Sequence, residues 1–171
     1  MKKPRLHTQS MTREKGLSLI ELMTAMVIIG ILASAAAPAM RSLFERKSTA
    51  SIGDYFVKSV KLARVEAIQR GRDVTIETES GSGDWSEGWR IETLNDNGNI
   101  EVIRSFPALS NAIVFTSNIF GAGTALTIKA TGQVSDIGSF ELYYPDCEGT
   151  QHFTFNLLLS GLVQRGVKEC Q

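Results

Sequence analysis

Residues 17–40 form one almost continuous apolar segment, which only four polar residues interrupt: Ser18, Glu21, Thr24 and Ser34. An α-helix rises about 1.5 Å per residue, so a helix of this length reaches about 33–36 Å. The hydrocarbon core of a bilayer is about 30 Å thick. Five basic residues precede the segment, which predicts that the N-terminus stays in the cytoplasm while the rest of the chain lies outside.

An ordinary cleavable secretory signal is the first alternative, because three alanines, residues 35–37, precede Pro38 and would suit a signal peptidase. Two residues argue against it. Gly16 stands at the junction between the charged leader and the apolar segment, where an ordinary signal needs no particular residue. Glu21 lies inside the apolar segment, where an acidic side chain costs roughly 2.5–3.5 kcal/mol on insertion scales. Glu21 is therefore a candidate functional residue.

Residues 15–23, Lys-Gly-Leu-Ser-Leu-Ile-Glu-Leu-Met, resemble the class III signal of type IV pilins and type II secretion pseudopilins. The resemblance implies that a prepilin peptidase cuts between Gly16 and Leu17 and methylates the new N-terminus at Leu17. It also implies that Glu21 is the residue that directs assembly. Leu17 stands where that family usually has phenylalanine.

Glu21 is expected to pair with a cation, because an unpaired carboxylate is costly in lipid. By resemblance, that cation is the free amine of Leu17 on a neighbouring subunit. Cleavage would create this partner, and the pair would fix the axial register between subunits. In the alternative, Glu21 lies near enough to the end of the helix to reach the headgroups as a lone acid.

The sequence thus predicts a leader peptide, a transmembrane and assembly helix, and a periplasmic globular domain: residues 1–16, 17–40 and 41–171. The expected location is the bacterial inner membrane with a single pass, and later a pilus or pseudopilus. The expected partners are other major and minor pilins or pseudopilins, the prepilin peptidase and the inner-membrane assembly platform.

Beyond Arg41 the helical pattern continues in amphipathic form, with apolar residues spaced three or four apart on one face: Ile52, Phe56, Val60, Ala63 and Ala67. Gly71 is expected to end this helix. Gly53 and the neighbouring small residues 48–51 predict a weak point where the helix kinks.

Short strands follow, separated by glycine-rich turns and predicted at residues 74–78, 88–92, 100–103, 113–116, 125–130, 139–144, 152–158 and 162–163. A long helix followed by such strands indicates an α+β fold. Residues 62–76 and 85–89 resemble the conserved blocks of the GspH/FimT family, especially its FimT/FimU minor pilins. The resemblance implies the type IV pilin-like fold, a long N-terminal helix packed on antiparallel sheet.

Catalytic chemistry is not expected, and no cofactor or metal is predicted. His7 and His152 are the only histidines, and His152 next to Phe153 is most simply a structural strand residue. Residues 95–99 echo a calcium loop, but the spacing fits a hairpin turn better. A signal-anchored enzyme would need a site that the sequence does not contain.

Two features mark the C-terminal end. Cys147 and Cys170 are the only cysteines, and in an exported protein they predict one disulfide. Arg165 and Lys168 resemble the paired basic positions before a late cysteine that some FimT-type pilins use to bind DNA. Two phosphate contacts give little affinity. The simpler interpretation is a solvated strand end.

The charge of the chain does not favour a general polyanion-binding surface. From Leu17 onward, 13 basic residues face 17 acidic ones, so the formal charge is −4. The resemblance to FimT/FimU implies a minor pilin of a type IV pilus that works at the tip or in initiation. A type II secretion pseudopilin and a DNA receptor in natural transformation are the alternatives.

Overall fold

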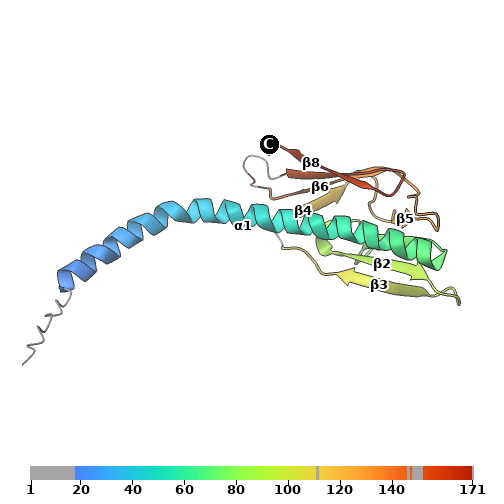
Figure 1. Ribbon diagram of the computed structural model, residues 1–171, viewed down its shortest axis with the longest axis horizontal. Helices are drawn as coiled ribbons and strands as arrows, with labels where there is room; N and C mark the ends of the chain where they lie inside the picture. The colour runs from blue at the N-terminus through green and yellow to red at the C-terminus, as the bar shows by residue number, and fades with distance from the viewer. Residues whose placement is uncertain (1–17, 111, 146, 148–151, 171) are drawn as a thin grey trace, which may run out of the picture. The chain divides into compact units, whose positions relative to one another are not determined.

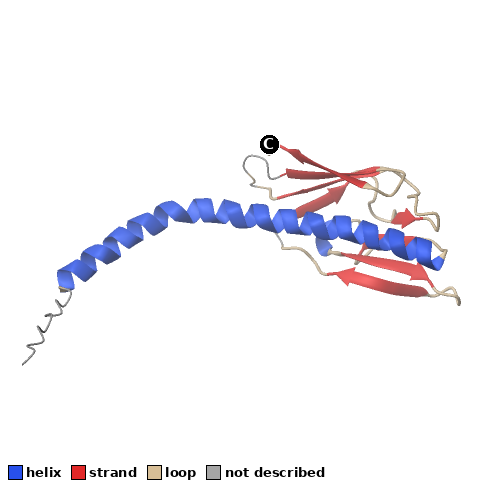
Figure 2. Ribbon diagram, viewed as in Figure 1, coloured by secondary structure: helices blue, strands red, loops and turns tan. Residues whose placement is uncertain are grey.

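The computed structural model describes residues 18–110, 112–145, 147 and 152–170. The chain divides into two units, one up to Met40 and one from Arg41 onward. A single long helix is followed by short strands (Figures 1 and 2). The elements in chain order are α1 (Leu19–Arg70), β1 (Val74–Thr78), the 3₁₀ turn η1 (Trp85–Glu87), β2 (Trp89–Leu94), β3 (Ile100–Phe106), β4 (Val114–Ser117), β5 (Leu126–Ile128), β6 (Gly138–Tyr143), β7 (His152–Leu157) and β8 (Val163–Lys168).

The strands form two antiparallel sheets of four strands each. The first sheet has the order β3-β2-β1-β5 and the second has the order β4-β6-β7-β8. In Figure 1 the second half of α1 lies with β6 and β8 on one side and with β2 and β3 on the other. The expected α+β fold with a long helix on antiparallel sheet is therefore confirmed, with the strands divided between two sheets.

The predicted apolar face of α1 forms the centre of the domain. Phe56, Val60, Ala63 and Ala67 are completely buried. The Phe56 ring lies 4.5–5.9 Å, centroid to centroid, from five other aromatic rings, contributed by η1 and by both sheets: Trp85, Trp89, Phe115, Phe140 and Phe155. Mostly edge-to-face pairs of this kind add about 0.5–1.5 kcal/mol each beyond their area burial. The helix therefore joins the two sheets through one aromatic cluster.

The helix ends as the sequence predicts. Gly71 has a φ of +63°, in the left-handed region that glycine adopts without strain. The Arg72 backbone N–H donates to the Ala67 carbonyl at 3.2 Å, the six-to-one bond of a Schellman cap. β1 begins three residues after the cap, at Val74.

The predicted weak point does not interrupt the helix, because α1 continues without a break through residues 48–53. Thr49 is completely buried, and its hydroxyl donates to the Glu45 carbonyl at 2.5 Å. Gly53 has a different role from the one expected. A Cβ at this position would lie 2.6 Å from Cζ of Phe155 on β7, so glycine allows the helix to approach that ring closely.

The last strand is longer than predicted. The sequence predicts a strand at residues 162–163, whereas β8 extends from Val163 to Lys168. Within this strand, Gly166 pairs with Thr154 of β7. A Cβ on Gly166 would lie 2.6 Å from the Thr154 hydroxyl oxygen, so the glycine again permits close packing.

We predict that Gly53→Ala destabilises the domain although alanine is the better helix former. Overpacking a core typically costs about 1–3 kcal/mol, whereas the gain in helix propensity is at most about 1 kcal/mol. Urea unfolding of the fragment from Arg41 onward, followed by tryptophan fluorescence, measures the difference. Gly121→Ala is the matched control, because a Cβ at Gly121 would meet no other atom within 4 Å. A Gly53→Ala midpoint at or above wild type would contradict the close-packing role.

Candidate functional site

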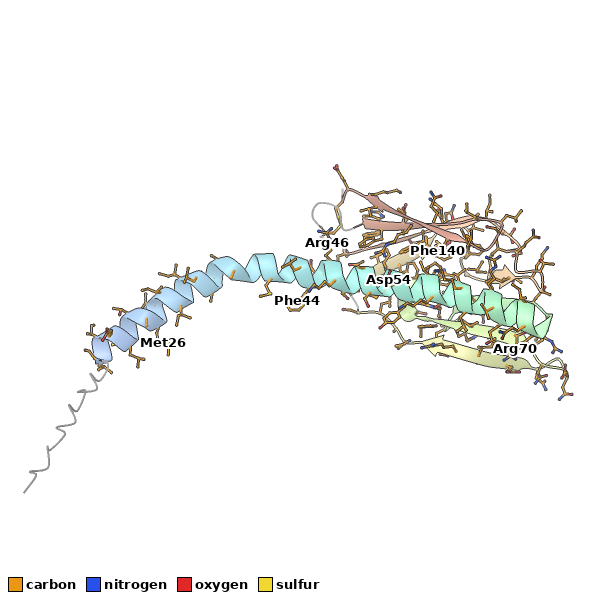
Figure 3. The ribbon with its side chains drawn as sticks, in the orientation of Figure 1. Met26, Phe44, Arg46, Asp54, Arg70 and Phe140 are labelled. Atoms are coloured by element: carbon orange, nitrogen blue, oxygen red, sulfur yellow. A yellow bond between two sulfur atoms is a disulfide. The ribbon has the colours of Figure 1, made fainter. Side chains whose placement is uncertain are left out.

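The N-terminal unit presents a continuous apolar surface. Residues Leu19–Ala36 form a helical stretch that is long and apolar enough to cross a membrane. Every described side chain in this stretch is exposed, and Met26, for example, has 64% of its surface accessible (Figure 3). Exposed apolar area of this extent indicates contact with lipid or with other proteins.

Glu21 lies in the first turn of α1. Its Oε2 accepts a hydrogen bond from the Ser18 backbone N–H at 3.4 Å, and its carbonyl accepts one from the Thr24 hydroxyl at 2.9 Å. The Ser18–Glu21 bond is one half of a capping box, in which a residue in the first turn reaches back to the start of the helix. The Ser-x-x-Glu spacing is a known signal for such a cap, and the sequence interpretation missed it.

The predicted processing site cannot be placed in the same way. Gly16 and Leu17 lie outside the described residues, so cleavage between them and methylation of Leu17 stay predictions.

The tryptophan block at residues 85–89 is part of the core. Trp85 and Trp89 are each 1% exposed. The Trp85 indole N–H donates to the Phe120 carbonyl at 2.7 Å, and the Trp89 indole N–H donates to the Ser59 hydroxyl of α1 at 2.9 Å. Because a buried indole N–H needs an acceptor, these bonds fix how the block packs against the helix.

The C-terminal end is fastened by the predicted disulfide. Cys147 and Cys170 are bonded, with their Cα atoms 5.7 Å apart. Cys170 follows β8, an edge strand that pairs only with β7. The disulfide therefore ties the end of this edge strand to the segment that follows β6.

The two candidate DNA-binding cations are strand residues with acidic partners. The guanidinium of Arg165 bonds to the Asp54 carboxylate of α1 at 2.7 Å and lies 4.5 Å from the Phe153 ring centroid. The Lys168 ammonium pairs with the Glu141 carboxylate of β6. This hydrogen bond from Lys168 lowers the pKa of Glu141 below its ordinary value. Arg165 and Lys168 lie on β8, in agreement with the simpler interpretation of a strand end, and both cations are already partly neutralised.

His152 belongs to the same cluster of polar residues. Its Nε2 lies 3.1 Å from Oε2 of Glu141, and its ring lies tilted by 30° against the Tyr143 ring with the centroids 4.5 Å apart. In the part of the chain that the structure describes, no three histidine, cysteine or acidic residues lie close enough to hold a metal ion. The Asn95–Asn99 segment forms a hairpin turn, in which the Asn95 side-chain oxygen accepts from the backbone N–H groups of Asn97 and Asn99.

An amphipathic helix packed on two antiparallel sheets, after an apolar segment of membrane length, defines a type IV pilin-like subunit. The chain belongs to the family described as type II transport protein GspH, whose sequence model matches residues 54–161. The prokaryotic N-terminal methylation motif matches residues 11–37. No curated protein matches the sequence.

Solved structures of two related proteins share the fold. The type IV minor pilin FimU of Pseudomonas aeruginosa superposes with a TM-score of 0.59 at 19% identity, over 75% of this chain and 99% of that one. The minor pseudopilin EpsH from the Type 2 Secretion System of Vibrio cholerae superposes with a TM-score of 0.55 at 12% identity, over 70% of this chain and 97% of that one. The chain is a minor pilin or pseudopilin of a type IV pilus or a type II secretion system.

We predict that the ion pairs of β8 limit binding to DNA. In gel shifts the fragment from Arg41 onward should bind weakly, with a slope of log K against log salt no steeper than about −2, because at most two phosphates are contacted. Asp54→Asn with Glu141→Gln should strengthen binding, since both changes free a cation, whereas Arg165→Ala with Lys168→Ala should abolish it.

The matched control is Glu79→Gln with Asp136→Asn. It removes the same charge from exposed carboxylates that make no ion pair among the described residues. Equal strengthening by the control would show that net charge, and not the release of Arg165 and Lys168, governs the binding.

Proposed function

We propose that this protein is a minor subunit of a type IV pilus that acts at the tip or in the initiation complex. In this proposal residues 1–16 are removed as a leader, residues 17–40 anchor the chain in the inner membrane and residues 41–171 fold in the periplasm. In this role the protein takes part in assembly and catalyses no reaction. The observation that carries the proposal is a carboxylate, Glu21, in the first turn of an apolar helix of membrane length.

The hydrogen bonds of Glu21 leave its charge uncompensated. The Ser18 N–H lies 3.4 Å from the carboxylate, at the long end of the range for such a bond, and supplies no positive charge. Among the described residues no cation pairs with Glu21. A carboxylate at membrane depth is stabilised when a cation compensates it. We therefore assign the partner to another subunit, as the amine that cleavage would create at Leu17.

A type II secretion pseudopilin is the second candidate. The match to the GspH family model and the methylation motif suit both machines, and likeness at 12–19% identity supports the fold alone. The block at residues 85–89, which resembles the minor-pilin signature, favours the pilus. Deleting the gene and scoring piliation, protein secretion and DNA uptake side by side separates these functions.

We predict cleavage between Gly16 and Leu17. The methylation motif covers this junction, and the charged leader meets the apolar segment there. Intact-mass measurement of the membrane-extracted protein should give a chain that starts at Leu17, with or without one methyl group. A chain that starts near Pro38 would instead support the ordinary secretory signal.

We predict that Glu21→Gln abolishes incorporation into sheared filaments and leaves processing and membrane insertion unchanged. Glutamine keeps an oxygen that accepts the Ser18 N–H bond, so the helix cap survives while the charge is lost. Glu21→Ala removes both the cap and the charge, and its insertion should be at least as favourable as that of the wild type. Immunoblots of membrane and filament fractions measure both properties. Wild-type incorporation of Glu21→Gln would refute the paired-charge account.

A further inference from the structure

A groove of about 540 Å³ opens beside α1 in the folded domain. It lies between α1, the end of β3 and the segment that follows β3. Its floor is aromatic, because the Phe106 ring stacks on the buried Trp89 ring with centroids 5.1 Å apart. Its other lining residues include Ile52, Tyr55, Pro107 and Leu109.

The rim of this groove is fixed by the backbone. Gly88 has a φ of +91°, and a Cβ at this position would lie 2.3 Å from the Phe106 carbonyl oxygen. Glycine therefore lets the segment after β3 approach η1 closely. The Leu109 N–H donates to the Ser86 carbonyl at 2.8 Å, and Leu109 packs against the core. A groove held in this way is preorganised, which reduces the entropy lost when a partner binds.

Arg104 lines the groove and Lys58 lies next to Tyr55 of its lining, and neither cation has an acidic partner among the described residues. The Arg104 guanidinium lies 5.1 Å from the Phe106 ring centroid, and the Lys58 ammonium lies 5.7 Å from the Tyr55 ring centroid. No carboxylate among the described residues pairs with either of them. Five other cations of the domain each pair with a carboxylate: Arg70, Arg72, Arg90, Arg165 and Lys168.

We propose that this groove binds an acidic loop of a neighbouring pilin or pseudopilin subunit. The inference rests on the proposed function, which supplies the neighbouring subunit. Aromatic rings offer contact area at the centre of an interface, and Arg and Tyr are among the residues that dominate binding energy there. Lys58 and Arg104 complement the charge of an acidic segment and bias the choice of partner toward it.

A short acidic loop fits the charge of the domain better than a nucleic acid does. From Arg41 onward, 13 basic residues face 16 acidic ones, a formal charge of −3, so a long polyanion is repelled by the domain as a whole. Exposed charges are screened beyond about 8–10 Å at physiological salt. A loop with few charges therefore responds mainly to the two cations of the groove.

Site-specific photocrosslinking of the full-length chain in the bacterium that makes it tests the proposal. Ser105 lines the groove, and Ser105→p-benzoylphenylalanine places the probe there. Mass spectrometry of the crosslinked peptide should identify an acidic segment of another pilin or pseudopilin. Lys58→Glu with Arg104→Glu should reduce this crosslink at least tenfold.

Lys61→Glu with Lys129→Glu is the matched control, because both lysines are exposed and make no ion pair among the described residues, and neither lines the groove nor is placed against a lining side chain as Lys58 is. This control should leave the crosslink unchanged. Equal loss in both double variants, a crosslinked segment without acidic residues, or crosslinking to nucleic acid would each overturn the proposal.

Filament incorporation, scored on the same samples, separates the two proposals. If the wild-type chain enters filaments but the probe at Ser105 yields no crosslink to a subunit, the groove proposal fails and the assembly function stands. If the wild-type chain never enters a pilus or pseudopilus, the assembly function itself fails.

Discussion

The apolar face of α1 must be covered on two sides, and neither sheet covers it alone. Phe56 contacts Trp89 from the first sheet and Phe140 and Phe155 from the second. Removing a buried phenylalanine ring typically costs about 3–5 kcal/mol. Because both sheets pack around this one side chain, its loss would weaken the packing of both sheets against α1. The close approach at Gly53 brings the helix within reach of β7 at the same level.

The same helix has to satisfy two different environments. Its stretch at Leu19–Ala36 is apolar all round and exposed, whereas its later turns bury one face and leave charged residues on the other. The exposed apolar surface of the first stretch is suited to contact with lipid or with other proteins. Glu21 adds a polar requirement to that apolar contact. An apolar helix with a single carboxylate favours a neighbouring helix that places a cation at the same level along the helix axis. One charged pair can therefore select the axial register between two helices whose apolar surfaces are otherwise weakly specific.

Periodicity predicted most of this fold. The four-residue spacing of Phe56 and Val60 and the helix end at Gly71 follow from local rules, and the structure has both. Gly53 was interpreted as a weak point of the helix, although it makes room for the Phe155 ring of β7, which is distant in the sequence. Close packing of that kind depends on tertiary neighbours that a single sequence does not reveal. The acidic partners of Arg165 and Lys168 were missed for the same reason.

The block at residues 85–89 links the fold to the groove. Trp85 and Trp89 are buried, and Gly88 sets the position of the segment after β3, so this block serves the core and shapes the rim together. Tyr55, Lys58 and Arg104 are exposed, so changing them alters the surface while leaving the aromatic core intact. The buried tryptophans thus hold the fold of this region, while the exposed cations, in the proposal above, select the partner.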